Sequence, residues 1–187
     1  MSFNYSFIDL FAGIGGFRIP FEEMGCRCVF TSEMDRAAKE TYALNFGEEP
    51  NGDITEITSK MIPDHDILLA GFPCQAFSNA GRREGFMDTR GTLFFEIQRI
   101  MANKLPNAFI LENVKTLKNH KGPDGLRTFE VMKDILEGKT TPNKEEIEKY
   151  LGTGEALKTF RKKLDYSVSY SVLNAKDFGR PQNRERL

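Results

Sequence analysis

Short apolar runs alternate with longer stretches in which apolar residues recur every three or four positions. The runs predict strands, and they cover residues 7–11, 26–32, 67–70 and 108–111, the last two as buried strands. The longer stretches predict helices, and they cover residues 17–24, 35–46 and 91–103, while residues 52–54 fit a short strand or turn. This alternation favours an α/β fold with a mostly parallel sheet and helices on both faces.

The helix expected over residues 91–103 carries its apolar residues on one side. They are Leu93, Phe94, Ile97, Ile100 and Met101. In open parallel sheets, ligands bind beyond the carboxyl ends of the strands. The candidate binding and catalytic residues all lie at the ends of predicted strands or turns. They are Gly13, Glu33, Asp53, Cys74 and Glu112. We therefore expect one site along that edge.

The last third of the chain has a different pattern. Residues 137–163 are polar and charged with two glycine breaks, which predicts a solvated excursion containing one or two helices. Residues 166–173 alternate as a strand does, and Arg184 to Leu187 resembles a strand just beginning. With 187 residues, the expected organisation is one domain, 1–187.

Composition narrows the class of protein. A content of 40% hydrophobic and 28% charged residues is that of a soluble globular protein. No apolar run approaches the roughly 20 residues that cross a bilayer, and the first residues lack the features of a signal peptide, so we expect a cytoplasmic protein. Three cysteines make no disulfide framework. The net charge of −1 does not indicate a nucleic-acid binder, so any basic surface must be local or on another segment.

The glycine cluster at residues 13–16 is the first candidate site. Its order, Gly13-x-Gly15-Gly16, departs from the dinucleotide fingerprint, and a plain glycine turn explains it equally well. Glu33 lies 20 residues beyond Gly13, where an acid can bond a ribose diol, although it could also be a helix-starting charge like Asp35. Together with Asp53 these residues favour a pocket for adenosine.

Cys74 is the second candidate, because it directly follows Pro73 where an expected strand ends. A thiol becomes a nucleophile when it is exposed and a positive neighbour favours the thiolate. Arg82, Arg83 and Arg90 are near enough in sequence to supply that charge. The alternatives are a chance surface thiol and an ordinary solvated charge pair at Arg82 and Arg83.

Glu112 is the third candidate, since it follows the apolar run 108–111. It is either a solvated strand end or a partly desolvated acid that gives a proton or hydrogen bond to a ring nitrogen. Cys26 and Cys28 lie on an expected strand without a surrounding set of Cys or His, so we expect no metal there.

Five blocks of the chain resemble, in order, blocks of the bacterial DNA (cytosine-5)-methyltransferases. They are FIDLFAGIGGF, GFPCQAFS, RGTLF, LENV and QNRER, and they span nearly the whole chain outside the excursion. The resemblance implies the N-terminal catalytic part of such an enzyme, with a seven-stranded Rossmann-like methyltransferase fold. It also implies S-adenosylmethionine as methyl donor, S-adenosylhomocysteine as product, no metal, and double-stranded DNA as partner.

The resemblance also implies roles for individual residues. Cys74 would add to C6 of a flipped cytosine, Glu112 would contact N3, and Arg184 would contact the carbonyl. Phe11 would stack on the adenine of the cofactor, Glu33 would hold the ribose hydroxyls and Asp53 would bond the adenine amino group. The further cofactor-binding positions are Gly13, Gly15, Gly16, Met34, Ile54, Pro73 and Leu93; the DNA-binding positions are Gln75, Ser78, Arg82, Arg83 and Arg186.

Family members continue past the QNRER block into a target-recognition domain and two further blocks. We therefore expect a truncated enzyme or the first subunit of a split one, which by itself binds cofactor weakly and methylates DNA poorly. Three other functions fit parts of the pattern: a tRNA cytosine methyltransferase, a non-catalytic cofactor-binding subunit and a nicotinamide oxidoreductase. The last leaves Cys74 and Glu112 without a role.

Overall fold

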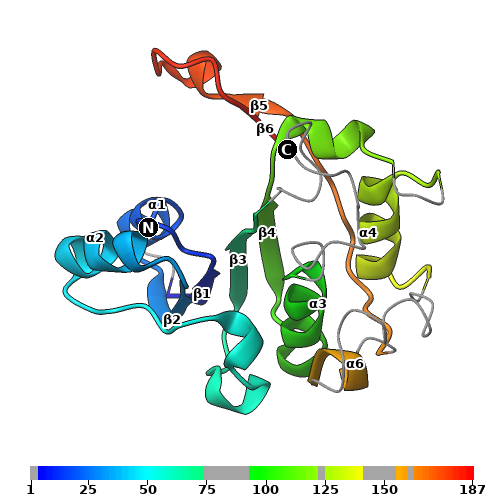
Figure 1. Ribbon diagram of the computed structural model, residues 1–187, viewed down its shortest axis with the longest axis horizontal. Helices are drawn as coiled ribbons and strands as arrows, with labels where there is room; N and C mark the ends of the chain where they lie inside the picture. The colour runs from blue at the N-terminus through cyan, green and yellow to red at the C-terminus, as the bar shows by residue number, and fades with distance from the viewer. Residues whose placement is uncertain (1–3, 74–92, 122–124, 141–154, 160–161) are drawn as a thin grey trace. The chain divides into compact units, whose positions relative to one another are not determined.

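The computed structural model describes residues 4–73, 93–121, 125–140, 155–159 and 162–187 (Figure 1). By its contacts the chain divides into two compact units. The first comprises Met1–Phe72 with Asn103–Leu111, and the second comprises Pro73–Ala102 with Glu112–Leu187. The single domain expected from the sequence stays a prediction.

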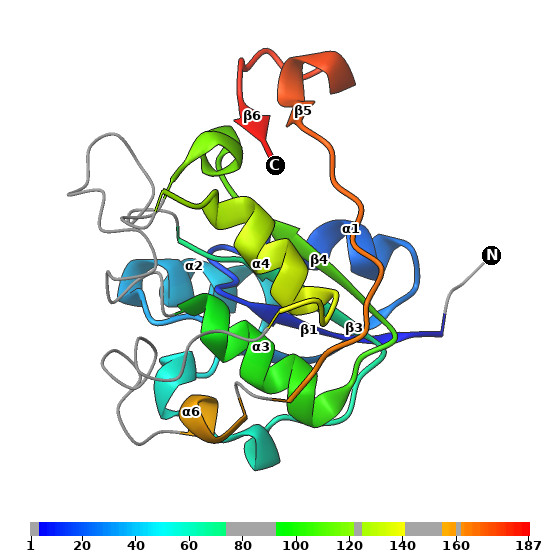
Figure 2. The same cartoon turned by 90° about the vertical axis from the view of Figure 1, so that its right-hand side faces the viewer.

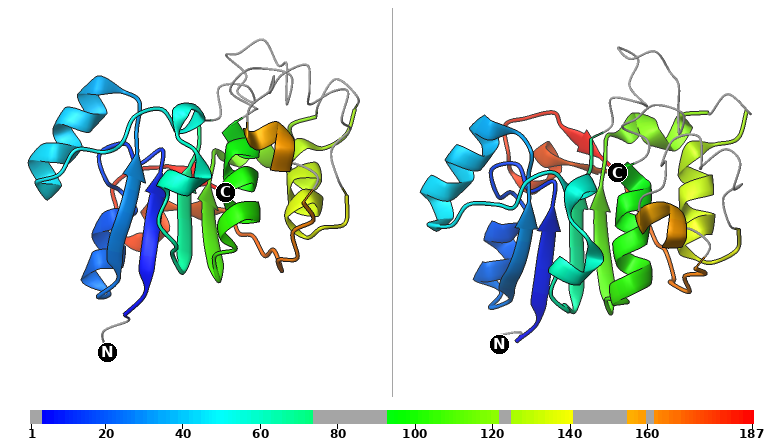
Figure 3. Two further views of the ribbon diagram at one scale, coloured as in Figure 1. Left: turned by 90° about the horizontal axis from the view of Figure 1, so that it is seen from below. Right: turned by 60° about the horizontal axis from the view of Figure 1, so that its bottom comes forward.

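A four-stranded sheet forms the centre of the first unit. Its order is β2-β1-β3-β4, with β1 at Ser6–Leu10, β2 at Arg27–Ser32, β3 at Ile67–Gly71 and β4 at Ala108–Glu112. β1 pairs in parallel with both β2 and β3, and all four arrows in Figure 3 point the same way. Leu10 is in register with Ser32 and with Ala70, so the carboxyl ends of three strands meet at one edge. The predicted parallel sheet is confirmed.

The helices of the first unit begin and end at recognisable signals. α1 spans Arg18–Glu23 and α2 spans Arg36–Phe46, followed by the 3₁₀ turns η1 at Ile54–Glu56 and η2 at Ser59–Met61. Asp35 caps α2 by accepting a bond from the Ala38 amide at 2.8 Å, and Gly47 ends the helix with φ 72°. The helix start that the sequence assigns to Asp35 is thus confirmed.

Aromatic side chains close the core on β1. Phe7 is fully buried, and Phe17 and Phe21 pack against the cluster that Phe7 forms with Cys26 and Leu69. The rings of Phe7 and Phe21 lie 5.5 Å apart. This burial fixes the start of α1, and with it the glycine-rich turn that joins β1 to α1.

The second unit contains most of α3 and the rest of the chain. α3 spans Leu93–Lys104, η5 Lys115–Asn119, α4 Thr128–Leu136 and α6 Glu155–Thr159. η6 at Ala175–Phe178 lies between β5 at Leu173–Asn174 and β6 at Glu185–Arg186, two short strands that pair antiparallel. Figure 2 shows this pair apart from α4. The predicted strand start at residues 184–187 is confirmed, and α6 is a helix of the predicted excursion.

α3 is buried all round rather than on one side. Residues 94–102 are all buried, including Arg99 with 2% of its surface exposed. Its guanidinium contacts the carboxylates of Glu96 and Glu155, each at 2.7 Å. A charge deep in this helix is thus tolerated because two carboxylates compensate it, one of them brought by α6.

Two strand expectations are wrong in part. β4 is not a buried strand: its residues are exposed or half-buried, and 44% of the surface of Ile110 is exposed. It lies at the end of the strand order, so among the described residues it has a strand neighbour on one side only. Residues 166–172 form no strand, because their amides bond the end of α4 instead of a ladder, Tyr166 to the Leu136 carbonyl and Val168 to the Glu137 carboxylate.

No helix of the described residues is long and apolar enough to cross a membrane.

Candidate active site

The turn after β1 has an unusual backbone. Phe11, Gly13 and Gly15 have φ values of 57°, 56° and 94°, in the left-handed region that glycine adopts most readily. Phe11 has a side chain and still adopts it, which costs about 1–3 kcal/mol and persists only where the surrounding structure enforces it. The Ala12 amide bonds the Ser32 carbonyl at 3.0 Å, so the end of β2 holds this turn against the sheet.

Glu33 joins two segments at this edge of the sheet. One carboxylate oxygen accepts the Gly13 amide and the other accepts the Asp35 amide, both at 2.8 Å. The side chain therefore fixes the glycine turn and the start of α2 together. A carboxylate offers about four acceptor positions, so two remain for the hydroxyl groups of a ligand.

Asp53 comes to the same edge through the segment before it. The Glu33 amide bonds the Asn51 carbonyl at 2.9 Å, and the Ser32 hydroxyl bonds the Gly52 carbonyl at 2.9 Å. Asp53 then caps η1 by accepting the Thr55 amide at 2.9 Å with one oxygen. Three of the residues that the sequence assigns to a nucleoside, Gly13, Glu33 and Asp53, are thus brought together.

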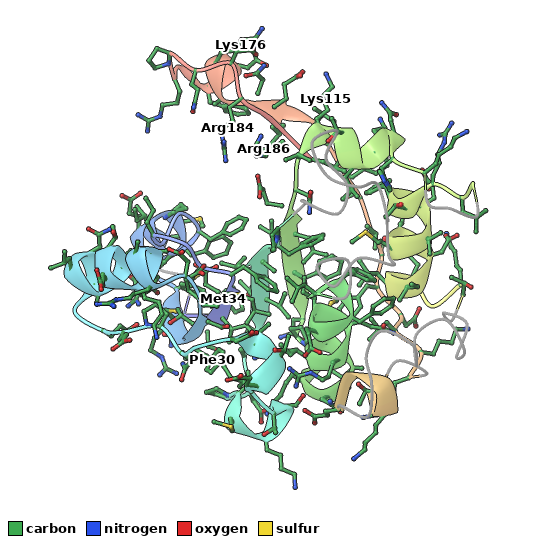
Figure 4. All side chains as sticks on the ribbon, in the orientation of Figure 1. Phe30, Met34, Lys115, Lys176, Arg184 and Arg186 are labelled. Carbon is green, nitrogen blue, oxygen red and sulfur yellow. The ribbon has the colours of Figure 1, made fainter. Side chains whose placement is uncertain are left out.

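The glycine turn offers open space at two positions. A Cβ atom placed on Gly13 or Gly16 would meet no atom of the described residues within 4 Å. Met34 (Figure 4), two residues after β2, has 69% of its surface exposed, whereas Ile54 is buried. The remaining cofactor positions, Pro73 and Leu93, are half-buried residues of the second unit.

Asp9 is a notable residue that the sequence analysis missed. It lies within β1 with 1% of its surface exposed, and neither carboxylate oxygen has a hydrogen-bond partner in the described part of the chain. Burial raises its pKa to about 7; the Arg18 guanidinium opposes this shift and the Glu33 carboxylate adds to it. An acid inside the run Phe7-Ile-Asp-Leu-Phe was the signal that could have revealed it.

The second unit arranges charged side chains around Glu112. The Arg186 guanidinium lies 2.6 Å from the Glu112 carboxylate, and Lys115 pairs with Glu185 at 2.7 Å (Figure 4). Asn113 and Leu187 exchange two backbone hydrogen bonds of 2.9 Å. Residues near the end of the chain are thereby joined to the end of β4.

The sequence analysis assigns the carbonyl contact to Arg184 and a DNA contact to Arg186. It is Arg186 that the structure pairs with Glu112, while the Arg184 amide bonds the Asn174 side chain at 3.1 Å. Both arginines belong to one motif and are separated by one residue, so the motif alone could not show which would reach Glu112. Their roles toward a substrate stay predictions.

Part of the predicted site lies outside the described residues. It comprises Cys74, Gln75, Ser78, Arg82, Arg83 and Arg90. Within the ranges that are described, no group of three or more His, Cys, Asp or Glu residues is placed to hold a metal ion.

Comparison with known proteins gives a consistent result. Residues 5–139 and 148–187 match the family model described as C-5 cytosine-specific DNA methylase. The chain is 51% identical over 185 residues to the Type II methyltransferase M1.ScrFI of Lactococcus lactis subsp. cremoris, covering 98% of this chain and 40% of that protein. It is 48% identical over 181 residues to M.HhaI of Haemophilus parahaemolyticus, covering 97% and 47%. The chain thus spans less than half of the length of these relatives.

Solved structures agree on the fold. The Entamoeba histolytica methyltransferase EhMeth superposes with a TM-score of 0.69 at 20% identity, over 99% of this chain and 52% of that one. The Dnmt2 methyltransferase of S. pombe gives 0.65 at 20% identity, over 98% and 49%. The Rossmann-like methyltransferase fold expected from the sequence is confirmed, and within the described residues its main sheet has four of the seven strands that the resemblance implies.

Proposed function

Because this chain belongs to the family of C-5 cytosine-specific DNA methylases, we propose that its protein methylates C5 of a flipped cytosine in double-stranded DNA. The methyl donor would be S-adenosylmethionine, and the setting a restriction-modification or other epigenetic system. The observation that carries the proposal is the edge where Glu33 bonds Gly13 with its carboxylate and, with its amide, bonds Asn51 in the segment that leads to Asp53. A DNA substrate fits the cytoplasmic location that the sequence predicts, so we include that location in the proposal.

The residues of the first unit fit the adenosine part of this donor. Glu33 retains acceptor positions for two ribose hydroxyls, and Gly13 and Gly16 leave room for a ligand to approach the backbone. Asp53 would accept the adenine amino group, and Phe11 would contact the ring face. When bound, S-adenosylmethionine supplies an electrophilic methyl group on a sulfonium sulfur.

Glu112 and Arg186 would recognise the target base in the second unit. An ionised carboxylate only accepts hydrogen bonds, so Glu112 would have to be protonated to donate to the ring nitrogen N3; the Arg186 guanidinium, 2.6 Å from it, would donate to the adjacent carbonyl O2. We therefore propose the carbonyl contact for Arg186, and retain Arg184 as the residue that the sequence favours.

Cys74 would act as nucleophile. Its thiolate would form a bond to C6 while Glu112 supplies a proton or hydrogen bond at N3, which leaves C5 electron-rich. After C5 is methylated, its proton leaves, the carbon–sulfur bond breaks, and the aromatic ring returns with the thiolate released. The base must leave the duplex stack for this addition.

The rest of the protein would supply the sequence-reading surface. The relatives are more than twice as long as the matched region, so DNA recognition is proposed for the whole protein rather than for these 187 residues. A target-recognition domain, in the same chain or in a second subunit, would be the partner. The 187 residues alone are expected to bind cofactor weakly and to methylate DNA poorly.

Transfer of radiolabelled methyl groups to duplex DNA tests the proposal. The full-length protein is compared with Cys74→Ala, and Cys28→Ala serves as a matched control because this half-buried thiol lies on β2. Label in DNA that disappears only with Cys74→Ala supports the reaction and the nucleophile. Label that enters tRNA but not duplex DNA, or that survives in Cys74→Ala, contradicts it.

A further inference from the structure

Side chains of α2, as well as Glu33, hold the glycine turn in place. The Asn45 side chain donates to the Ile14 carbonyl at 3.4 Å. The ring of the next residue, Phe46, lies against Gly15, where an added Cβ atom would sit 2.2 Å from Cε2 and 2.5 Å from Cζ. Both contacts come from the last two residues of α2, and both meet the part of the turn that Glu33 does not hold.

Phe46 is itself held in place. Its ring lies 4.5 Å from the ring of Tyr42, one helical turn earlier, and the Arg18 guanidinium lies 4.5 Å from its centre. Arg18 is buried and donates to Glu22 at 2.7 Å, to the Tyr42 hydroxyl at 2.8 Å and to Glu48. The ring cannot move away from Gly15 without disturbing this network, so its position is fixed before any ligand arrives.

The turn needs such support because of its backbone. Gly13 and Gly15 both have positive φ, and glycine loses more conformational freedom on ordering than any other residue. A turn held only at Gly13 would retain several conformations at residues 14–16. If a ligand requires one of these conformations, its apparent dissociation constant equals the intrinsic constant divided by the fraction of molecules that adopt that conformation.

We infer that Phe46 and Asn45 are positioning residues for the cofactor: they hold residues 14–16 in the conformation that S-adenosylmethionine binds. The inference rests on the proposed function. Neither side chain is required to touch the ligand, since each acts through the backbone of the turn. Phe46 makes the larger contribution because its ring blocks movement of Gly15, whereas the Asn45 bond is long.

The dissociation constant for S-adenosylmethionine, measured by calorimetry on the full-length protein, tests the inference. Phe46→Ala is expected to weaken binding by about 10-fold to 100-fold, the result if only about 1–10% of the molecules still hold the turn in the required conformation. Phe46→Leu retains most of the apolar volume and is expected to restore most of the affinity. Leu44→Ala on the same helix is the matched control, because 88% of the surface of Leu44 is exposed.

A double-mutant cycle separates positioning from general destabilisation. Gly15→Ala places its methyl group against the Phe46 ring, so Phe46→Ala is expected to relieve part of its effect, and the double variant should bind more tightly than the product of the two single effects. Folding of every variant is checked by denaturant unfolding, and affinities are measured where each is folded.

Unchanged affinity in Phe46→Ala, or strictly additive effects in the cycle, would overturn the inference while leaving the proposed function intact. If the unaltered protein itself fails to bind S-adenosylmethionine, the proposed function fails, and the positioning role fails with it.

Discussion

The Arg186 guanidinium and the Glu112 carboxylate lie 2.6 Å apart, with about a third of each side chain exposed. The two residues are brought together by the backbone bonds between Asn113 and Leu187, which set β6 beside the end of β4. A charged pair on this edge has solvent on one side, so it is available to a substrate rather than buried for stability.

If Arg186 makes the proposed carbonyl contact, Arg186→Ala is expected to lower the rate constant of methyl transfer by about 100-fold, because a donor to the target base is lost. Arg184→Ala is expected to lower it less, since Arg184 makes no ion pair with Glu112 in the described structure. Single-turnover kinetics with saturating DNA measure both. A larger effect at Arg184 would return the carbonyl contact to that residue.

Asp9→Asn should change how stability depends on pH. Burial raises the pKa of Asp9 from 3.8 to about 7, so in this range the folded state binds more protons than the unfolded state. The free energy of unfolding of the unaltered protein therefore falls as pH rises from 4 to 7, by up to about 4 kcal/mol from this group.

The asparagine variant does not titrate there. Its stability relative to the unaltered protein is expected to increase between pH 4 and pH 8, whatever its offset at pH 4. Urea unfolding at four pH values measures the difference. A difference that stays constant across this range would show that Asp9 is ionised throughout.

Arg99→Ala is expected to destabilise the protein by about 3–5 kcal/mol, because it removes the guanidinium that lies 2.7 Å from the buried Glu96 carboxylate. The matched control is Arg36→Ala, which removes the exposed pair with Glu40 and should cost less than about 1 kcal/mol. Guanidinium unfolding compares the two. Equal effects would mean that solvent already compensates Glu96.

Asp35→Ala is expected to cost about 0.5–2 kcal/mol, since the Ala38 amide loses its capping partner. Glu40→Ala on the exposed side of α2 is the control. The same unfolding experiment measures both variants, and a cost at Asp35 no greater than at Glu40 would argue that Glu33 alone starts the helix.

The sequence predicted best where local pattern and tertiary structure agree. The runs before Phe11, Glu33 and Gly71 are strands because their apolar residues have no alternative to burial in a parallel sheet, and the acid after β2 then falls beside the glycine turn. Glu33 accepts the Asp35 amide beside the start of α2, so its interpretation as a helix-starting charge is confirmed, and it also accepts the Gly13 amide. Its contact with a ribose stays a prediction.

The sequence-based predictions were wrong or incomplete where the structure of a residue depends on a distant part of the chain. Residues 166–172 alternate like a strand, but an alternating pattern does not specify a pairing partner, and their amides bond the end of α4. From the sequence pattern alone, Arg99 would belong to a polar side of α3. In the structure it bonds Glu155, 56 positions later in the chain. Asp9 sits in an apolar run in which Phe7, Ile8 and Leu10 are buried, and only the fold shows that its carboxylate has no hydrogen-bond partner among the described residues.

The pairing of Asn113 with Leu187 also has a consequence for the order of events on the ribosome. The strands of the first unit have all been synthesised by residue 112, whereas the guanidinium that faces Glu112 belongs to residue 186. At about 5–20 residues per second, several seconds of translation separate the two. The nascent chain can therefore form the edge that holds Gly13 and Glu33 while the edge around Glu112 is still incomplete, because the latter also requires β6.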